Sequence, residues 1–162
     1  ELRIATYWLY NISKPPNTLF HMAWLQLRIN TTSEHADAIG LVLTDSGAEI
    51  ARDQRGTITG QIEVGVERET ALLSVRFLAD DGDLFVPEDE ENSLGWEIAD
   101  ESIAEVEHHE EDGKWAFHIL GHAAGETTIS LKILHDDHAD FVSRPIEIHV
   151  TEGGPGEAHS DE

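Results

Sequence analysis

The 162-residue chain contains no cysteine. This absence excludes a disulfide framework, a zinc site with thiolate ligands and a cysteine nucleophile. Basic residues are also few: 10 lysines and arginines stand against 33 aspartates and glutamates, and the formal net charge is -23 at pH 7. Such a charge repels nucleic-acid backbones and anionic membrane surfaces. We therefore expect no nucleic-acid partner, and we expect proteins, neutral ligands or metal ions instead.

Long hydrophobic runs are absent as well. No stretch of 18 apolar residues occurs, so the sequence predicts no spanning helix and no membrane insertion. The start of the chain shows no basic segment followed by an apolar run, so no secretory signal is predicted. Serines, histidines and acids occur, but never in the patterns G-x-S-x-G, H-E-x-x-H or G-x-G-x-x-G. We therefore expect a protein without catalytic residues, which is not an enzyme.

Alternation of apolar and polar residues dominates the chain after residue 37. Residues 71–78 show it best, because Leu73, Val75 and Phe77 fall on one face. Further strands are predicted over residues 39–44, 48–51, 56–66, 114–120, 127–134 and 144–150. Seven to nine short strands with turn residues between them are typical of an all-β sandwich.

Two segments carry a more specific pattern. Residues 96–107 are W-E-I-A-D-E-S-I-A-E-V-E, in which Trp96 and Ile98 are expected to enter a core, and residues 121–129 are G-H-A-A-G-E-T-T-I. In this order they resemble the bacterial Ig-like domains of group 2, which are modules of surface proteins and of invasin- or intimin-type adhesins. The resemblance covers about residues 57–151. It implies an immunoglobulin-like β-sandwich located outside the cell, at the cell surface or in the periplasm.

The first 31 residues differ in composition from the rest. They contain one acid, three bases and five of the eleven aromatic residues, and residues 23–29 alternate well enough for a strand. An accessory segment over residues 1–37 would thus precede the sandwich over residues 38–151 and a flexible acidic tail over residues 152–162.

The strand of this accessory segment has three possible explanations. It pairs with the sheet of its own domain, it adds to the sheet of a neighbouring copy, or part of the segment is foreign to the domain. In the second case the chain forms a homo-oligomer or a filament. The residues that would dock on the neighbouring copy are Trp8, Trp24, Leu25 and Leu27.

Acidic residues concentrate in one region. Residues 79–112 hold 15 aspartates and glutamates and neither lysine nor arginine. Asp80, Asp81 and Asp83 surround a glycine and are candidate calcium ligands, because calcium prefers several oxygen donors from a flexible loop. Their spacing does not match the EF-hand pattern, however, and an Asp-Gly pair is also common in simple turns. Both interpretations stay open.

Histidines are numerous, with ten in the chain and six between residues 108 and 138. In the absence of cysteine, a zinc or copper site would use imidazole nitrogens and carboxylate oxygens. The sequence His135-Asp136-Asp-His138 offers two of each in a predicted loop, and His118 is a candidate from a neighbouring strand. The alternative is that these are surface histidines, which offset the negative charge at mildly acidic pH.

Two functional hypotheses follow. The first is a non-catalytic extracellular or cell-surface structural or adhesive module, which assembles with itself through its N-terminal strand and requires no cofactor. The second is a periplasmic or surface metal-binding protein, which uses the histidines and acids to hold zinc, copper or calcium.

Overall fold

The computed structural model describes residues 38–136 and 138–158. The chain divides into two units, Glu1–Thr31 and Thr32–Glu162, and every described residue belongs to the second unit. The described residues form β-strands and one short 3-10 helix, so the all-β prediction is confirmed. None of their helices has the length and hydrophobicity needed to cross a membrane. The predicted assembly residues lie outside the described residues: Trp8, Trp24, Leu25 and Leu27.

The first sheet has seven strands in the order β3-β2-β1-β6-β10-β9, with β7 paired to β6. All of its pairings are antiparallel. Its strands are β1 (Gly40–Asp45), β2 (Ala48–Gln54), β3 (Thr57–Gly60), β6 (Leu73–Leu78), β7 (Leu84–Phe85), β9 (Ala104–Glu107) and β10 (Ala116–Gly121).

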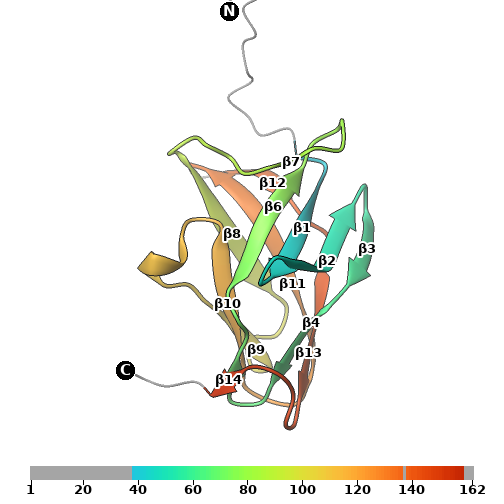
Figure 1. The fold of residues 1–162 in the computed structure, drawn as a ribbon, viewed down its shortest axis with the longest axis vertical. Helices are drawn as coiled ribbons and strands as arrows, with labels where there is room; N and C mark the ends of the chain where they lie inside the picture. Colours follow the sequence, from blue (N-terminus) through green and yellow to red (C-terminus); the bar gives the residue numbers. More distant parts are fainter. Residues whose placement is uncertain (1–37, 137, 159–162) are drawn as a thin grey trace, which may run out of the picture. The chain divides into compact units, whose positions relative to one another are not determined.

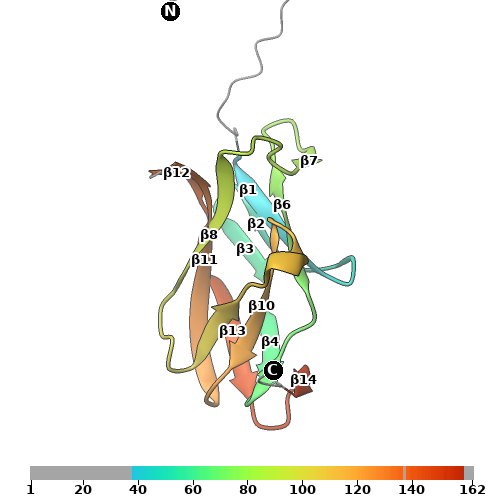
Figure 2. The same cartoon turned by 90° about the vertical axis from the view of Figure 1, so that its left-hand side faces the viewer.

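The second sheet has five strands in the order β12-β11-β13-β4, with β8 paired to β11. Only the pairing of β13 with β4 is parallel among these strands. Its strands are β4 (Ile62–Gly65), β8 (Asn92–Ile98), β11 (Gly125–His135), β12 (His138–Val142) and β13 (Ile146–Thr151). The two sheets face each other as the layers of a sandwich (Figures 1 and 2). The predicted sandwich is therefore confirmed.

The core lies between the two sheets and follows the predicted alternation. Leu73, Val75 and Phe77 of β6 are buried, whereas the residues between them are exposed. The second sheet contributes Ile129, Leu131 and Ile133 of β11, together with Ile146, Ile148 and Val150 of β13. Because burial of each such side chain stabilises the fold by about 1.5–3 kcal/mol, this two-sided core is the main source of stability.

One predicted strand is divided between the two sheets. Residues 56–66 were expected to alternate as one strand, but β3 pairs with β2 in the first sheet and β4 pairs with β13 in the second. The chain changes sheets at Gln61, directly after Gly60. Gly60 has a φ of 78°, and a Cβ atom there would overlap the carbonyl oxygen of Ile50. Glycine is therefore required at this crossing point.

Trp96 differs from its prediction. It is paired with Leu131 and so lies on the inner side of β8, but its side chain is 39% exposed and does not belong to the core. The side chain is exposed because, among the described strands, β8 pairs only with β11 and forms an edge of its sheet. The indole ring instead stacks on His108, with ring centroids 6.1 Å apart. Ile98 packs against the core as expected.

Residues 152–158, the described part of the expected acidic tail, include one short strand. β14 (Glu157–Ala158) pairs with β5 (Arg68–Glu69) in an antiparallel two-stranded sheet. The Gly65 N–H donates to the carbonyl oxygen of Pro155 at 2.7 Å, and Arg68 donates to that of Gly156 at 2.8 Å. These contacts, from the Gly65 main chain and the Arg68 guanidinium group, attach residues 155–158 to the sandwich.

Candidate metal-binding sites

The hairpin between β11 and β12 brings two predicted metal ligands together. His135 and His138 pair across the ladder, and their rings stack with centroids 5.6 Å apart. Asp136, in the turn between them, has a φ of 51°. Positive φ values are typical of tight hairpin turns and are well tolerated by aspartate. The role of Asp136 is therefore to shape the turn, while the two imidazoles meet beside it.

Asp140, which was not among the predicted residues, is a third candidate ligand in the hairpin. Ile133 pairs with Phe141 and Leu134 pairs with Ala139, which leaves Asp140 as the extra residue of a β-bulge. Bulges redirect side chains, and the Asp140 side chain is only 9% exposed. Its carboxylate lies 3.1 Å from Nε2 of His138 and 3.6 Å from Nδ1 of His135. The spacing of two residues after His138 was the only signal for Asp140 in the sequence.

Strand β8 supports this hairpin from the other side. Oε2 of Glu91, which directly precedes β8, lies 3.2 Å from Nε2 of His135. This hydrogen bond, more than any other influence, raises the pKa of His135. Burial opposes the increase, and the charges of Asp136, Asp140 and Glu91 add to it.

His118 belongs to a different cluster from the hairpin histidines. It lies on β10 of the first sheet, whereas His135 lies on β11 of the second. Its Nδ1 is 2.9 Å from the carbonyl oxygen of Thr70 and 3.1 Å from Oε1 of Glu69. The structure therefore separates His118 from the ligand set in which the sequence placed it.

The second cluster is completed by the 3-10 helix η1 (Glu110–Asp112), which follows β9. Oδ1 of Asp112 lies 3.5 Å from Nε2 of His118, and the rings of His109 and His118 are 5.8 Å apart. Glu107 is paired with His118 across the β9–β10 ladder. One possible ligand atom each from Glu69, Glu107 and His109 lies within 4.8 Å of the others.

Two opposing influences act on Asp112 in this cluster. Burial is the largest of them and would raise the pKa of its carboxyl group. The hydrogen bond from the His109 N–H, at 2.8 Å, and the nearby rings of His118 and His109 nevertheless lower the pKa below its ordinary value. Asp112 therefore stays ionised and ties η1 to the outer surface of β10.

The predicted calcium ligands Asp80, Asp81 and Asp83 form a turn. Oδ1 of Asp81 accepts the N–H of Asp83 at 3.0 Å, and the Ala79 N–H donates to the Asp83 carbonyl oxygen at 2.9 Å. All three side chains are exposed. Among the described residues, neither group of converging ligand atoms includes them. This geometry favours the simple turn, the second of the two interpretations of this sequence.

Comparisons with known proteins find similarity over only part of the chain. No family model matches the chain. The ribosomal protein L11 methyltransferase of Shewanella denitrificans is 67% identical over 27 residues, which are 17% of this chain and 9% of that protein. The chain thus matches only a small part of that relative's length. A crystal structure of domains 4 and 5 of the S-layer protein SbsC gives a TM-score of 0.40 at 16% identity, over 57% of this chain and 48% of that chain.

Proposed function

We propose that the chain is a non-catalytic structural module of an extracellular or cell-surface protein, of the group 2 bacterial Ig-like type. The observation that carries this proposal is the placement of its first and last strands. β1 begins at the end of the sandwich near β7 and β12, and β14 lies toward the opposite end (Figures 1 and 2). Domain termini often lie close together, which suits insertion. Opposite ends instead suit modules that are joined in series.

The packing of the sandwich supports a spacer role. Core residues from both sheets form one cluster, and the main-chain contacts of β14 with β5 hold the exit of the chain against the domain. A module of this kind keeps a fixed distance between its neighbours, while its loops and edges stay available for contacts. The net charge of -23 keeps such modules soluble when many are crowded together.

Self-assembly is the finer part of the proposal, and charge supports it. The first 31 residues carry three bases and one acid, whereas the remainder of the chain is strongly acidic. A basic, aromatic segment is attracted to an acidic sandwich, and strand addition would give it main-chain hydrogen bonds. Among the described strands, β3 lies at an edge of the first sheet, and its side chains are mostly exposed. It is a suitable strand for such an addition.

Sedimentation of two chains tests the assembly. The full chain should form oligomers, and a chain lacking residues 1–31 should be monomeric and should keep a far-ultraviolet circular dichroism spectrum of β type. In the full chain, Trp24→Ala together with Leu27→Ala should weaken assembly, whereas the control Gln26→Ala should not. Normal assembly of the shortened chain would refute the assembly role.

Location and the spacer role are tested separately. A membrane-impermeant amine reagent applied to intact cells of the source organism should label the chain, and labelling only after lysis would contradict a surface location.

Small-angle scattering of two chains that lack residues 1–31, fused in tandem, should give a maximum dimension close to the sum of two modules. A dimension near that of one compact particle would contradict the arrangement in series.

A further inference from the structure

We propose that His135, His138 and Asp140 form a binding site for one divalent transition-metal ion of the zinc type, at the β11–β12 end of the sandwich. The site goes beyond the structural role, because a module needs no metal to act as a spacer. It is also separate from the cluster around His118.

The donor set suits such an ion. Two imidazole nitrogens and one carboxylate oxygen are the ligands of zinc sites that keep one position open for water. One atom from each residue lies within 4.8 Å of the others. A tetrahedral ion with bonds of about 2.0–2.2 Å needs ligand atoms about 3.3–3.5 Å apart. Oδ1 of Asp140 lies 3.1 Å from Nε2 of His138, and Oδ2 of Asp140 lies 3.6 Å from Nδ1 of His135, so each imidazole has a carboxylate oxygen near this separation.

Only a small movement is needed to complete the geometry. The hairpin ladder and the bulge place His135 and Asp140, whose side chains are 14% and 9% exposed. His138 is 61% exposed, so its ring is free to turn toward an arriving ion. Two ligands are therefore already in position, and the third closes on the metal.

The hydrogen bond to Glu91 supports the same assignment. Histidine ligands usually donate their second ring N–H to a carboxylate or a carbonyl group, which fixes the tautomer and orients the ring. Here Nε2 of His135 faces Oε2 of Glu91 at 3.2 Å, and Nδ1 faces Asp140. A proton held on Nε2 by Glu91 leaves the lone pair of Nδ1 directed at the proposed ion.

Asn92 provides an independent observation. It is paired with His135 in the β8–β11 ladder, so the two side chains lie on the same face. Asn92 is 3% exposed, and its Oδ1 accepts no hydrogen bond from any described residue. Buried polar atoms in native proteins nearly always have a partner, and an ordered water or ion is a common one. Water held in the open metal position would supply this partner.

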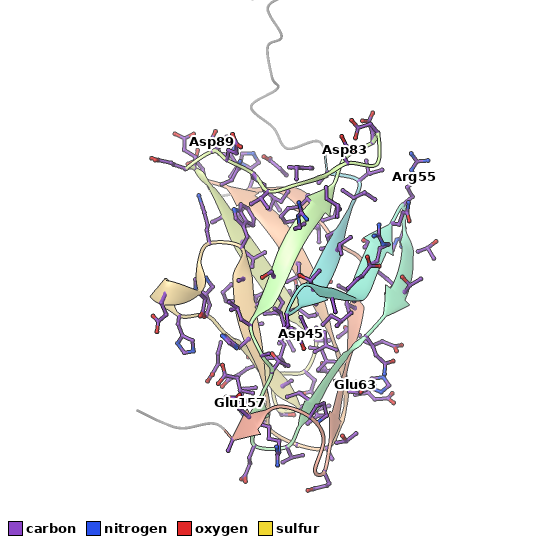
Figure 3. All side chains as sticks on the ribbon, in the orientation of Figure 1. Asp45, Arg55, Glu63, Asp83, Asp89 and Glu157 are labelled. Carbon is purple, nitrogen blue, oxygen red and sulfur yellow. The ribbon has the colours of Figure 1, made fainter. Side chains whose placement is uncertain are left out.

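The charge around the site favours cations. The acidic loops that contain Asp83 and Asp89 lie at the same end of the sandwich as β12 (Figures 1 and 3). A region of one sign of charge raises the local concentration of ions of the opposite sign. Selection of zinc over calcium then comes from the two imidazole nitrogens, because calcium prefers oxygen ligands.

Calorimetric titration of the full chain with zinc chloride at pH 7.5 tests the site. We expect one saturable site with a Kd below about 10 µM, and at least tenfold weaker binding in His138→Ala and in Asp140→Asn. Glu91→Gln should weaken binding by about tenfold, as for other residues that orient a metal ligand. The matched control is His122→Ala, since His122 is a partly exposed histidine paired with Glu105 and outside both clusters.

Three further readings make the assignment specific. The ring resonances of His135 and His138 should shift on addition of zinc, whereas those of His122 should not. Binding should weaken at pH 5.5, because the imidazoles must lose their protons to bind metal. Calcium chloride should give no comparable heat.

Several results would overturn the proposal. These are no saturable binding tighter than about 1 mM, equal affinity in His138→Ala and wild type, or loss of binding in His118→Ala instead. Binding of calcium with the same affinity as zinc would also refute the assignment of imidazole nitrogens as ligands. Both His138 and Glu91 are largely exposed, so their variants should fold, and circular dichroism would verify this. None of these results bears on assembly of the module.

Discussion

Nε2 of His135 lies 3.2 Å from Oε2 of Glu91, and this contact joins the end of β11 to the residue that precedes β8. The two residues are 44 positions apart in the sequence. Their contact orients the His135 ring and raises its pKa, so it links the proposed metal site to the pH response of the fold.

Glu91→Gln should lower the pKa of His135 toward its ordinary value, because the first cause of the increase is removed. A raised pKa in the folded state stabilises the protein below the unfolded histidine pKa of about 6.5, and this contribution is lost as the pH rises through the raised value. The wild type should therefore have a larger free energy of unfolding than Glu91→Gln at pH 5.5, and the difference should vanish at pH 8.5.

Histidine titration by NMR measures the pKa, and urea unfolding at the two pH values measures stability. The control is Glu90→Gln, which removes the same charge from a neighbouring exposed residue. Because Glu91 is 66% exposed, the stability difference should shrink in high salt. An unchanged His135 pKa in Glu91→Gln would contradict the role of the contact.

Asp112→Asn should destabilise the domain by about 1 kcal/mol at pH 7, because the His109 N–H loses its charged acceptor. The lowered pKa of Asp112 contributes stability above the unfolded aspartate value of about 3.9, and this contribution is lost as the pH falls through the lowered value. Denaturant unfolding between pH 3 and pH 7 measures this trend. The exposed neighbour Glu111 provides the control Glu111→Gln, and an equal effect of both variants would contradict the prediction.

Phe77→Ala should lower the free energy of unfolding by about 3–5 kcal/mol, since it leaves a cavity in the core. Phe77 is fully buried, and its ring makes edge contacts with Trp115 at 5.3 Å and Phe141 at 5.7 Å between centroids. Thermal and urea unfolding measure the loss. Leu72→Ala is the control, because Leu72 is 37% exposed and should change stability by much less. Similar losses in both variants would show that the core does not lie around Phe77.

Gly60→Ala should destabilise the domain far more than Gly47→Ala. Both glycines have a positive φ, 78° and 83°, so each substitution carries a conformational cost of about 1 kcal/mol. At Gly60 the new Cβ also overlaps the carbonyl oxygen of Ile50, whereas nothing lies within 4 Å of a Cβ at Gly47. Comparison of the two melting temperatures separates backbone strain from steric overlap. Equal shifts of the two melting temperatures would mean that a side chain is tolerated at Gly60, where the chain changes sheets.

Residues of the candidate site show what local patterns can and cannot predict. His135 and His138 were predicted because their spacing brackets a tight hairpin turn, which is a local feature. Asp140 depends on the register of β11 against β12, where a bulge turns it toward the two rings. His118 was grouped with them because its strand was expected to neighbour theirs, but that strand pairs in the other sheet. Spacing along the chain carries no information on which sheet a strand joins.

The sequence by itself determined the all-β class and the inward face of β6, because alternation with a period of two is a property of neighbouring residues. Only the tertiary structure decided the change of sheets at Gln61, the exposure of Trp96, the pairing of β14 with β5 and the contact between Glu91 and His135. The physical reason is that these features depend on pairing between segments far apart in the chain. Such pairing is set by the free energy of the whole sandwich, so no local sequence pattern indicates it.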